Sequence, residues 1–243
     1  MISAIVNLKK SAGRSGPALL LTALFALSCH AAAAAPDCQS EAAPGVDWQE
    51  CQKKLLILKG SDLSGANLFG VDFTSTDLRN TNLLAANLEK ATLVRASLAD
   101  SDAKGAKFDR IEAYRTDFSR INAQGAVFAS AEMQRSNFDG ANLADVDFTK
   151  AELGRAQFSG ADITGSRFSL ANLARADLRT AKFTGPIDFA NAFFFLTRIE
   201  GVDLSNATGL AQWQIDMACG DNATKLPAGL AAAQAWPCQF END

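Results

Sequence analysis

The chain has 243 residues, of which 48% are hydrophobic and 21% charged, so its composition is that of a folded protein and not of a disordered one. Three basic residues and no acidic ones precede residue 36, which leaves 20 basic and 27 acidic residues, a net charge of −7, in the rest. This acidic balance argues against a nonspecific nucleic-acid binder. His30 is the only histidine, and its loss with that segment would exclude histidine-based catalysis, a Ser-His-Asp triad and histidine metal sites.

The first 35 residues are predicted to be a signal peptide. A basic stretch precedes the apolar run "PALLLTALFALS" (residues 17–28), and "HAAAAAP" offers several A-x-A cleavage sites. The run is too short for a stable membrane span. We therefore expect a periplasmic or secreted protein without a membrane span after cleavage. An uncleaved anchor stays open, as does a lipoprotein attached through Cys29, which Ala26 and Leu27 make the less favoured alternative.

Four cysteines follow that segment, two before the main body of the chain and two after it, and an even count in an exported chain favours disulfides. The local pairing, Cys38 with Cys51 and Cys219 with Cys238, is preferred among the three connectivities. Each bridge would close a loop of about 15 residues, worth up to ~3 kcal/mol. A zinc site of all four cysteines is the alternative, but their spacing does not match C-x2-C.

An internal repeat of five residues runs through the middle of the chain. From Leu63 to Phe183, all 25 positions at steps of five are non-polar, and the 25 positions two residues earlier hold only Ala, Ser, Thr, Val or Ile. A helix would move such positions around its axis, and a strand would need a period of two. The chain must therefore step, turn and step again, with a large residue pointing inward each time.

The repeated unit resembles the pentapeptide-repeat family, whose motif is A(D/N)LXX. "GANLF", "AANLE", "GANLA" and "LANLA" match this motif, and the resemblance extends over residues 46–207. It implies an all-β fold, a right-handed quadrilateral β-helix, which is a solenoid with four pentapeptides per coil. Some cytoplasmic members of the family are DNA mimics that protect type II topoisomerases, so the resemblance also implies that alternative function.

The sequence itself supports four pentapeptides per coil, because side chains of like size recur every 20 positions. Phenylalanine dominates two opposite inward groups, while Ala103, Ala113 and Ala123 lie between them, as close packing of a narrow core requires. The two groups are Leu68, Leu88, Phe108, Phe128, Phe148, Phe168 and Leu78, Leu98, Phe118, Phe138, Phe158, Leu178. One corner carries Gly65, Gly105, Gly125, Gly165 and Gly185, as a positive φ would require.

The array is predicted over residues 59–208, and all repeats together make about eight coils. Residues 36–58 are predicted to form an N-terminal cap and an irregular first coil, with Trp48 as a plug and Lys53 departing from the inward pattern. One extra residue in "TGPID" (residues 184–188) shifts the phase, which resumes at Phe189. Residues 209–243 are predicted to form a C-terminal cap with a short amphipathic helix within 209–220. Its apolar residues would cover the last coil, and a ligand pocket is the less favoured reading of Leu210, Trp213, Ile215 and Met217.

Charged residues stack on one corner of the predicted solenoid. Five arginines form a row with three glutamates beside it, and Lys90, Arg110 and Lys150 lie on the neighbouring corner. The row is Arg95, Arg115, Arg135, Arg155 and Arg175, and the glutamates are Glu112, Glu132 and Glu152. Arginine forks suit the docking of an anionic polymer or an acidic protein face. We favour the alternative, a ladder in which the glutamates neutralise the arginines, because exposed charges usually contribute little to binding.

Phe193 and Phe195 flank the inward Phe194 and are predicted to point outward. Neighbouring exposed aromatic side chains are typical of an interface. Because a cap must lie nearby, we favour a C-terminal segment that folds back over both rings.

A convex rod with a filled core has no pocket in which paired carboxylates could perform general acid–base catalysis. The sequence also shows no phosphate-binding glycine loop, nucleophile elbow or metal cluster, so we predict no catalytic, cofactor-binding or metal-binding residues. We expect a non-enzymatic scaffold or protein-binding surface of the cell envelope. Its partner would be a protein or another anionic molecule and no nucleic acid, and a homodimer through a rod end stays open. The alternatives are the DNA mimic and an enzyme with an unseen site in the last 35 residues.

Overall fold

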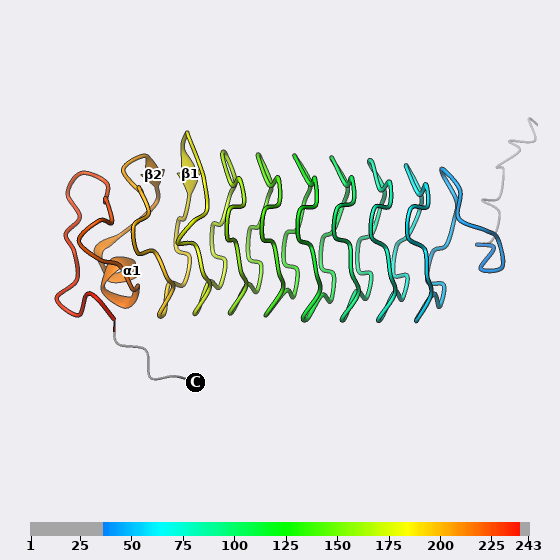
Figure 1. Ribbon diagram of the computed structural model, residues 1–243, viewed down its shortest axis with the longest axis horizontal. Helices are drawn as coiled ribbons and strands as arrows, with labels where there is room; N and C mark the ends of the chain where they lie inside the picture. The colour runs from blue at the N-terminus through cyan, green and yellow to red at the C-terminus, as the bar shows by residue number, and fades with distance from the viewer. Residues whose placement is uncertain (1–35, 239–243) are drawn as a thin grey trace, which may run out of the picture. The chain divides into compact units, whose positions relative to one another are not determined.

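The computed structural model describes residues 36–238, which form a stack of short coils around one continuous core (Figure 1). Parallel bridges join positions 20 residues apart, from Asp47 with Asn67 to Asp162 with Lys182. Within these residues, the strands β1 (Ile187–Asp188) and β2 (Ala207–Thr208) form a parallel pair, and the helix α1 is Gln212–Met217. No helix in the described part of the chain is both long and apolar enough to cross a membrane.

A turn with a left-handed residue follows each inward side chain and produces the five-residue step. From Glu50 to Arg175, a residue with positive φ recurs at every fifth position. Such a conformation costs most residues about 1–2 kcal/mol relative to glycine. Our expectation of one glycine corner was therefore too narrow, because every corner from Glu50 to Arg175 takes this conformation, most of them without glycine, while Gly185 does not take it.

Two phenylalanine ladders fill the core of the middle coils. Phe128 stacks on Phe108 and Phe148 with ring centroids 4.5 and 5.3 Å apart, and Phe138 stacks on Phe118 at 4.9 Å. The two ladders meet edge to face, for example Phe128 and Phe138 at 6.2 Å. The alanines predicted between the ladders are also fully buried. Large rings on two sides and small residues between them thus fill the core, as close packing requires.

The extra residue in "TGPID" changes the spacing between paired residues from 20 to 21. Arg167 pairs with Asp188, and the inward phase resumes at Phe189, which is fully buried. Ile187 is buried as well, whereas Phe183, predicted to be the last inward residue before the insertion, is only half-buried. The insertion therefore brings Ile187 into the core and leaves Phe183 only half-buried.

The N-terminal end is closed by Trp48 and a disulfide. The Trp48 ring is buried, and its Nε1 donates to Ser40 Oγ at 2.9 Å. Lys53 occupies an inward position, but its ammonium group lies 3.7 Å from the centre of the Trp48 ring, and burial lowers its pKa. The disulfide joins Cys38 to Cys51, with a Cα–Cα distance of 5.5 Å.

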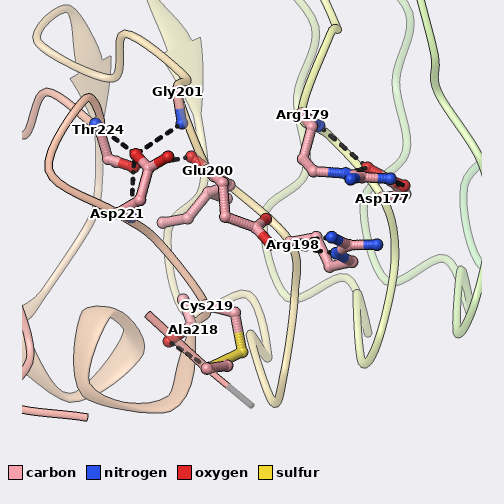
Figure 2. Close-up of polar contacts among 11 residues, drawn as sticks. Asp177, Arg179, Arg198, Glu200, Gly201, Ala218, Cys219, Asp221 and Thr224 are labelled. Carbon is pink, nitrogen blue, oxygen red and sulfur yellow. Dashed lines mark hydrogen bonds and ion pairs between the residues drawn. A yellow bond between two sulfur atoms is a disulfide. The ribbon is translucent and has the colours of Figure 1, made fainter. Parts of the chain in front are cut away.

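The helix α1 and the segment after it pack at the C-terminal end of the coils. Gln214 is buried and its Nε2 donates to the carbonyls of Phe189 and Ala192, both at 2.9 Å. Ile215 is also buried, whereas Trp213, which we expected to cover the last coil, is exposed. Figure 2 shows Cys219 in its disulfide with Cys238, whose Cα–Cα distance is 5.4 Å.

The segment after α1 is fixed by close contacts of its own. The Trp236 ring packs so near Gly220 that a Cβ there would lie 2.5 Å from it, and Trp236 Nε1 donates to Ala218 O at 2.6 Å. Asp221 accepts from the backbone N–H groups of Gly201 and Thr224, both at 3.0 Å (Figure 2). This end is therefore closed by a larger number of specific contacts than the N-terminal end.

Candidate functional site

The five arginines occupy left-handed positions at one corner of five successive coils. Their φ angles lie between 56° and 61°, and all five side chains are exposed. Each backbone N–H donates to the following coil, for example Arg115 N to Gln134 O at 3.1 Å and Arg135 N to Gly154 O at 2.9 Å. The backbone therefore fixes the row, and the guanidinium groups project from it at intervals of one coil, about 4.8 Å.

The three glutamates form a row next to the arginines without direct ion pairs to Arg95, Arg115, Arg135 or Arg155 in the described residues. Glu112, Glu132 and Glu152 pair with one another through successive backbone bridges, so three carboxylates lie one above another. Glu152 Oε2 accepts from Asn172 Nδ2 at 2.7 Å. Within residues 36–238, no ion pair is formed by these glutamates or by Arg95, Arg115, Arg135 and Arg155. The neutralised ladder that we favoured is therefore not formed through direct ion pairs in the described residues.

Other arginines of the described chain do form ion pairs. Arg120 forms an ion pair with Asp100 at 2.6 Å, and Arg79 forms one with Asp77 at 2.6 Å. The hydrogen bond from Arg79 lowers the pKa of Asp77 to about 2. On the corner next to the row, Arg110 pairs with Glu89. These pairs show that the chain places acids against arginines elsewhere on its surface.

Figure 2 shows two further pairs beyond the arginine row. Arg179 and Asp177 are 2.7 Å apart, and Arg198 donates to Glu200 at 3.0 Å. Burial would raise the pKa of Asp177, but hydrogen bonds from Arg179 outweigh it and lower that pKa. Unlike these arginines, the four arginines from Arg95 to Arg155 leave their guanidinium groups available for an external anion.

A shallow depression lies beside the row where two coils carry small side chains. Gly154 and Ala174 stand in the column that holds Tyr114 and Gln134 in earlier coils, so the surface is lower there. The depression is lined by Gln134, Arg135, Gly154, Arg155, Ala174 and Arg175. It has the chemistry of an anion-docking surface, with guanidinium groups at the side of a small apolar floor.

Phe193 and Phe195 lie at the end of the same surface. Asn172, next in the glutamate column, pairs with Phe193, and Arg175 N donates to Phe195 O at 2.8 Å. The two rings stack with centroids 6.2 Å apart and remain 43% and 44% exposed. The described part of the C-terminal segment, which we expected to cover both rings, leaves them partly exposed. Two candidates that the sequence presented separately are therefore continuous.

Sequence reasoning missed an apolar group at the other end of the row. Leu55 and Ile57 are 77% and 83% exposed, and Leu56 between them is partly exposed. Leu55 has a φ of 57° and occupies the corner position two coils before Arg95. Extending the column of arginines backward in steps of 20 would have revealed this residue.

A second depression, lined by Asp139, Gln157, Ser159, Asp177, Arg179 and Thr180, is polar, and its main charges pair with each other. No cluster of three His, Cys, Asp or Glu side chains able to hold a metal ion occurs among residues 36–238. Four of the cysteines are in disulfides.

Comparisons with known proteins agree with this architecture. The family described as pentapeptide repeats matches in 8 copies, over residues 56–83, 82–120, 114–149 and 151–185. No curated protein matches the chain in sequence. HetL, a pentapeptide repeat protein involved in heterocyst differentiation regulation from the cyanobacterium Nostoc sp. strain PCC 7120, is similar at 20% identity and a TM-score of 0.43, covering 82% of this chain and 92% of its own.

Two solved structures of QnrB1, a plasmid-mediated fluoroquinolone resistance protein, are more similar in fold. A trypsin-treated variant has 20% identity and a TM-score of 0.58, over 73% of this chain and 85% of its own. The full-length protein has 13% identity and a TM-score of 0.52, over 75% and 91%. At such identities the likeness shows the fold alone. Because the matched repeats cover more than half of its residues, the chain belongs to the pentapeptide-repeat family, with a right-handed β-helix type of fold.

Proposed function

We propose that this protein is a non-enzymatic scaffold of the cell envelope, periplasmic or secreted, whose arginine row docks an anionic partner. Four-sided coils, about eight in number, and the two caps would hold the row straight and rigid. The observation that carries the proposal is the absence of ion pairs at Arg95, Arg115, Arg135 and Arg155 within residues 36–238. Guanidinium groups at one-coil intervals fit carboxylate or phosphate groups on a partner.

The DNA-mimic alternative is less well supported. A mimic of DNA must present rows of negative charge, and an exposed row of arginines beside Glu112, Glu132 and Glu152 interrupts such a surface. The paired cysteines also fit an exported protein better than a cytoplasmic one. Cell fractionation that finds the uncleaved chain in the cytoplasm would contradict the envelope location and favour the mimic.

The docking role can be tested with the chain from Pro36 onward, because Pro36 begins a compact unit of its own. We would immobilise this chain, capture partners from envelope extract, and compare it with the triple variant Arg115→Ser, Arg135→Ser and Arg155→Ser. Each lost charge-assisted contact contributes ~1.5 kcal/mol or more, so the triple variant should bind each partner at least about a thousandfold more weakly.

The matched control removes three exposed positive charges elsewhere, at Lys104, Lys107 and Lys150, by substitution with Ser. If the control loses its partners as fully as the arginine variant, net charge and not the row determines binding. If the arginine variant keeps every partner, the docking role is wrong.

A further inference from the structure

The arginine row continues into apolar residues at both of its ends. We call the whole column the arginine edge, and all of its residues have positive φ. It consists of Leu55, Ser75, Arg95, Arg115, Arg135, Arg155, Arg175 and Leu196. One uninterrupted series of bridges runs on each side, from Gln52 to Phe193 and from Ile57 to Arg198. The edge is therefore a single column of stacked turns over seven coil steps, ~34 Å at one strand spacing per step.

The N-terminal end of this edge carries the most exposed large apolar side chains of the described residues. Leu55 is 77% exposed and Ile57 is 83% exposed. Both residues form backbone pairs only with the following coil. Leu55 N donates to Thr74 O at 3.0 Å, and Ile57 pairs with Asp77. Such exposure has no folding benefit, because burial of a leucine or isoleucine side chain stabilises by about 1.5–3 kcal/mol.

The C-terminal end of the edge carries a second apolar group. Phe193 and Phe195 stack on each other and remain partly exposed, and Leu196, the last residue of the edge, is half-buried. The edge therefore has apolar side chains at both ends and guanidinium groups between them. Its partner must offer anionic groups along its length and apolar contact at two places far apart.

We propose that the arginine edge docks the protein lengthwise on an anionic lipid bilayer, with the arginines at the headgroup phosphates and the apolar ends in the interface. This proposal rests on the proposed function, because it names the anionic partner of the same arginine row. Basic residues bordered by exposed apolar side chains are typical of proteins that lie on anionic membranes. A bilayer also fits a straight convex edge, because its headgroup layer is extended and deformable.

The neighbouring acids limit how deep the edge can enter. Glu112, Glu132 and Glu152 run along one side of it and would be repelled by headgroup phosphates. Contact is therefore expected at headgroup level, through the arginine tips and the terminal apolar side chains. A soluble polyanion would use the arginines in the same way, but it would not require Leu55 and Ile57 to be exposed.

The test is flotation of the chain from Pro36 with two kinds of vesicle, phosphatidylcholine alone and phosphatidylcholine mixed with phosphatidylglycerol. We expect binding to the anionic vesicles and little to the neutral ones. Replacing Arg115, Arg135 and Arg155 by Ser should weaken anionic binding on the order of a hundredfold, because each basic residue near such a surface contributes about 1 kcal/mol. The lysine control of the previous section should bind as the unaltered chain does.

Apolar variants separate lipid from other anions. Leu55→Ser with Ile57→Ser should weaken vesicle binding about tenfold, and Phe193→Ser with Phe195→Ser by a similar factor, while the melting temperature stays close to that of the unaltered chain. The binding that remains in the arginine variant should be insensitive to salt, whereas that of the unaltered chain should fall as salt rises.

Three results would overturn the lipid proposal. The first is that the unaltered chain does not float with anionic vesicles, and the second is that the arginine variant binds them as tightly as the unaltered chain. The third is that soluble polyglutamate abolishes binding while the apolar variants bind normally. The last result would identify an acidic polypeptide as the partner. In each case, arginine-dependent capture of a protein from envelope extract would leave the proposed docking function standing, so the two failures can be told apart.

Discussion

The middle coils and the two ends of this solenoid are stabilised in different ways. In the middle, each residue has its counterpart 20 positions away, and the same contacts recur in every coil, such as the stacking of Phe118 on Phe138 and of Phe138 on Phe158. At the ends there is no further coil, and individual contacts replace the repeat. Trp48 with its lysine closes one end, and buried Gln214 with the segment after α1 closes the other.

This difference indicates which parts of the chain mainly stabilise the fold and which parts are available to bind a partner. In a repeat array each coil is supported mainly by its neighbours, so the middle has two supporting coils and each end has only one. The C-terminal end compensates with many polar contacts, whereas the N-terminal end leaves Leu55 and Ile57 exposed beside the first coil. The two most exposed large apolar side chains of the described residues thus lie in the first coil, where the repeat begins, and are available to a partner.

The largest expected effect is the loss of a ring from the middle. Phe138→Ala should reduce the free energy of unfolding by about 3–5 kcal/mol, because the cavity would lie between two stacked rings in a core that cannot collapse. Denaturant unfolding measures this change. The matched control is Phe183→Ala near the insertion, where the ring is half-buried and the loss should be clearly smaller. Equal losses would contradict the view that the middle is the more tightly packed region.

The fold of the middle coils could be predicted from the sequence because the same short pattern of large and small residues recurs in every coil. A phenylalanine every 20 residues on two sides, with alanines between, defines the coil and its packing. The disulfide partners also followed from chain proximity, because Cys38 and Cys219 each have one nearby cysteine once the predicted signal peptide, which contains Cys29, is set aside. These features needed no knowledge of contacts beyond the neighbouring coil.

The candidate site could be predicted only in part. The arginine row followed from the period, but its pairing did not, because a carboxylate in the next column can point along its own ladder instead of toward Arg115. Phe193 and Phe195 were separated from the row by the insertion, which shifts the count by one. The exposure of Leu55 and Ile57 depends on what covers the first coil, and no periodic pattern determines that.

The second effect concerns the two disulfides. Replacing Cys38 and Cys51 by Ser should weaken the N-terminal end by about 3 kcal/mol, because the bridge constrains a short loop. Hydrogen exchange should then be faster around residues 45–58 and unchanged around residues 118–138. The comparison is Cys219→Ser with Cys238→Ser, which should cost less because Gln214 and Asp221 still hold that end. Faster exchange in the middle coils would show that the ends and the middle unfold together.

The smallest expected effect is that of Arg135→Gly, which tests whether the arginines of the row stabilise the fold. Arg135 has a φ of 61°, a conformation that glycine adopts at no steric cost, so Arg135→Gly should raise the free energy of unfolding by about 0.5–1 kcal/mol after the larger entropy loss of glycine is subtracted. The neighbouring Gln134 is not left-handed, and Gln134→Gly should lower the same free energy by about 0.5–1 kcal/mol. Thermal and denaturant unfolding of both variants would measure the difference.

A stabilised Arg135→Gly variant that also binds its anionic partner less tightly would separate the two roles of this position. The corner would then carry five arginines at a cost in stability, and only binding would explain their presence. If Arg135→Gly is instead as destabilising as Gln134→Gly, the arginine side chain must itself stabilise the coil, for example by packing its aliphatic part along the depression next to Gly154 and Ala174. The row would then be a structural element of the middle coils, and the docking function would lose its main support.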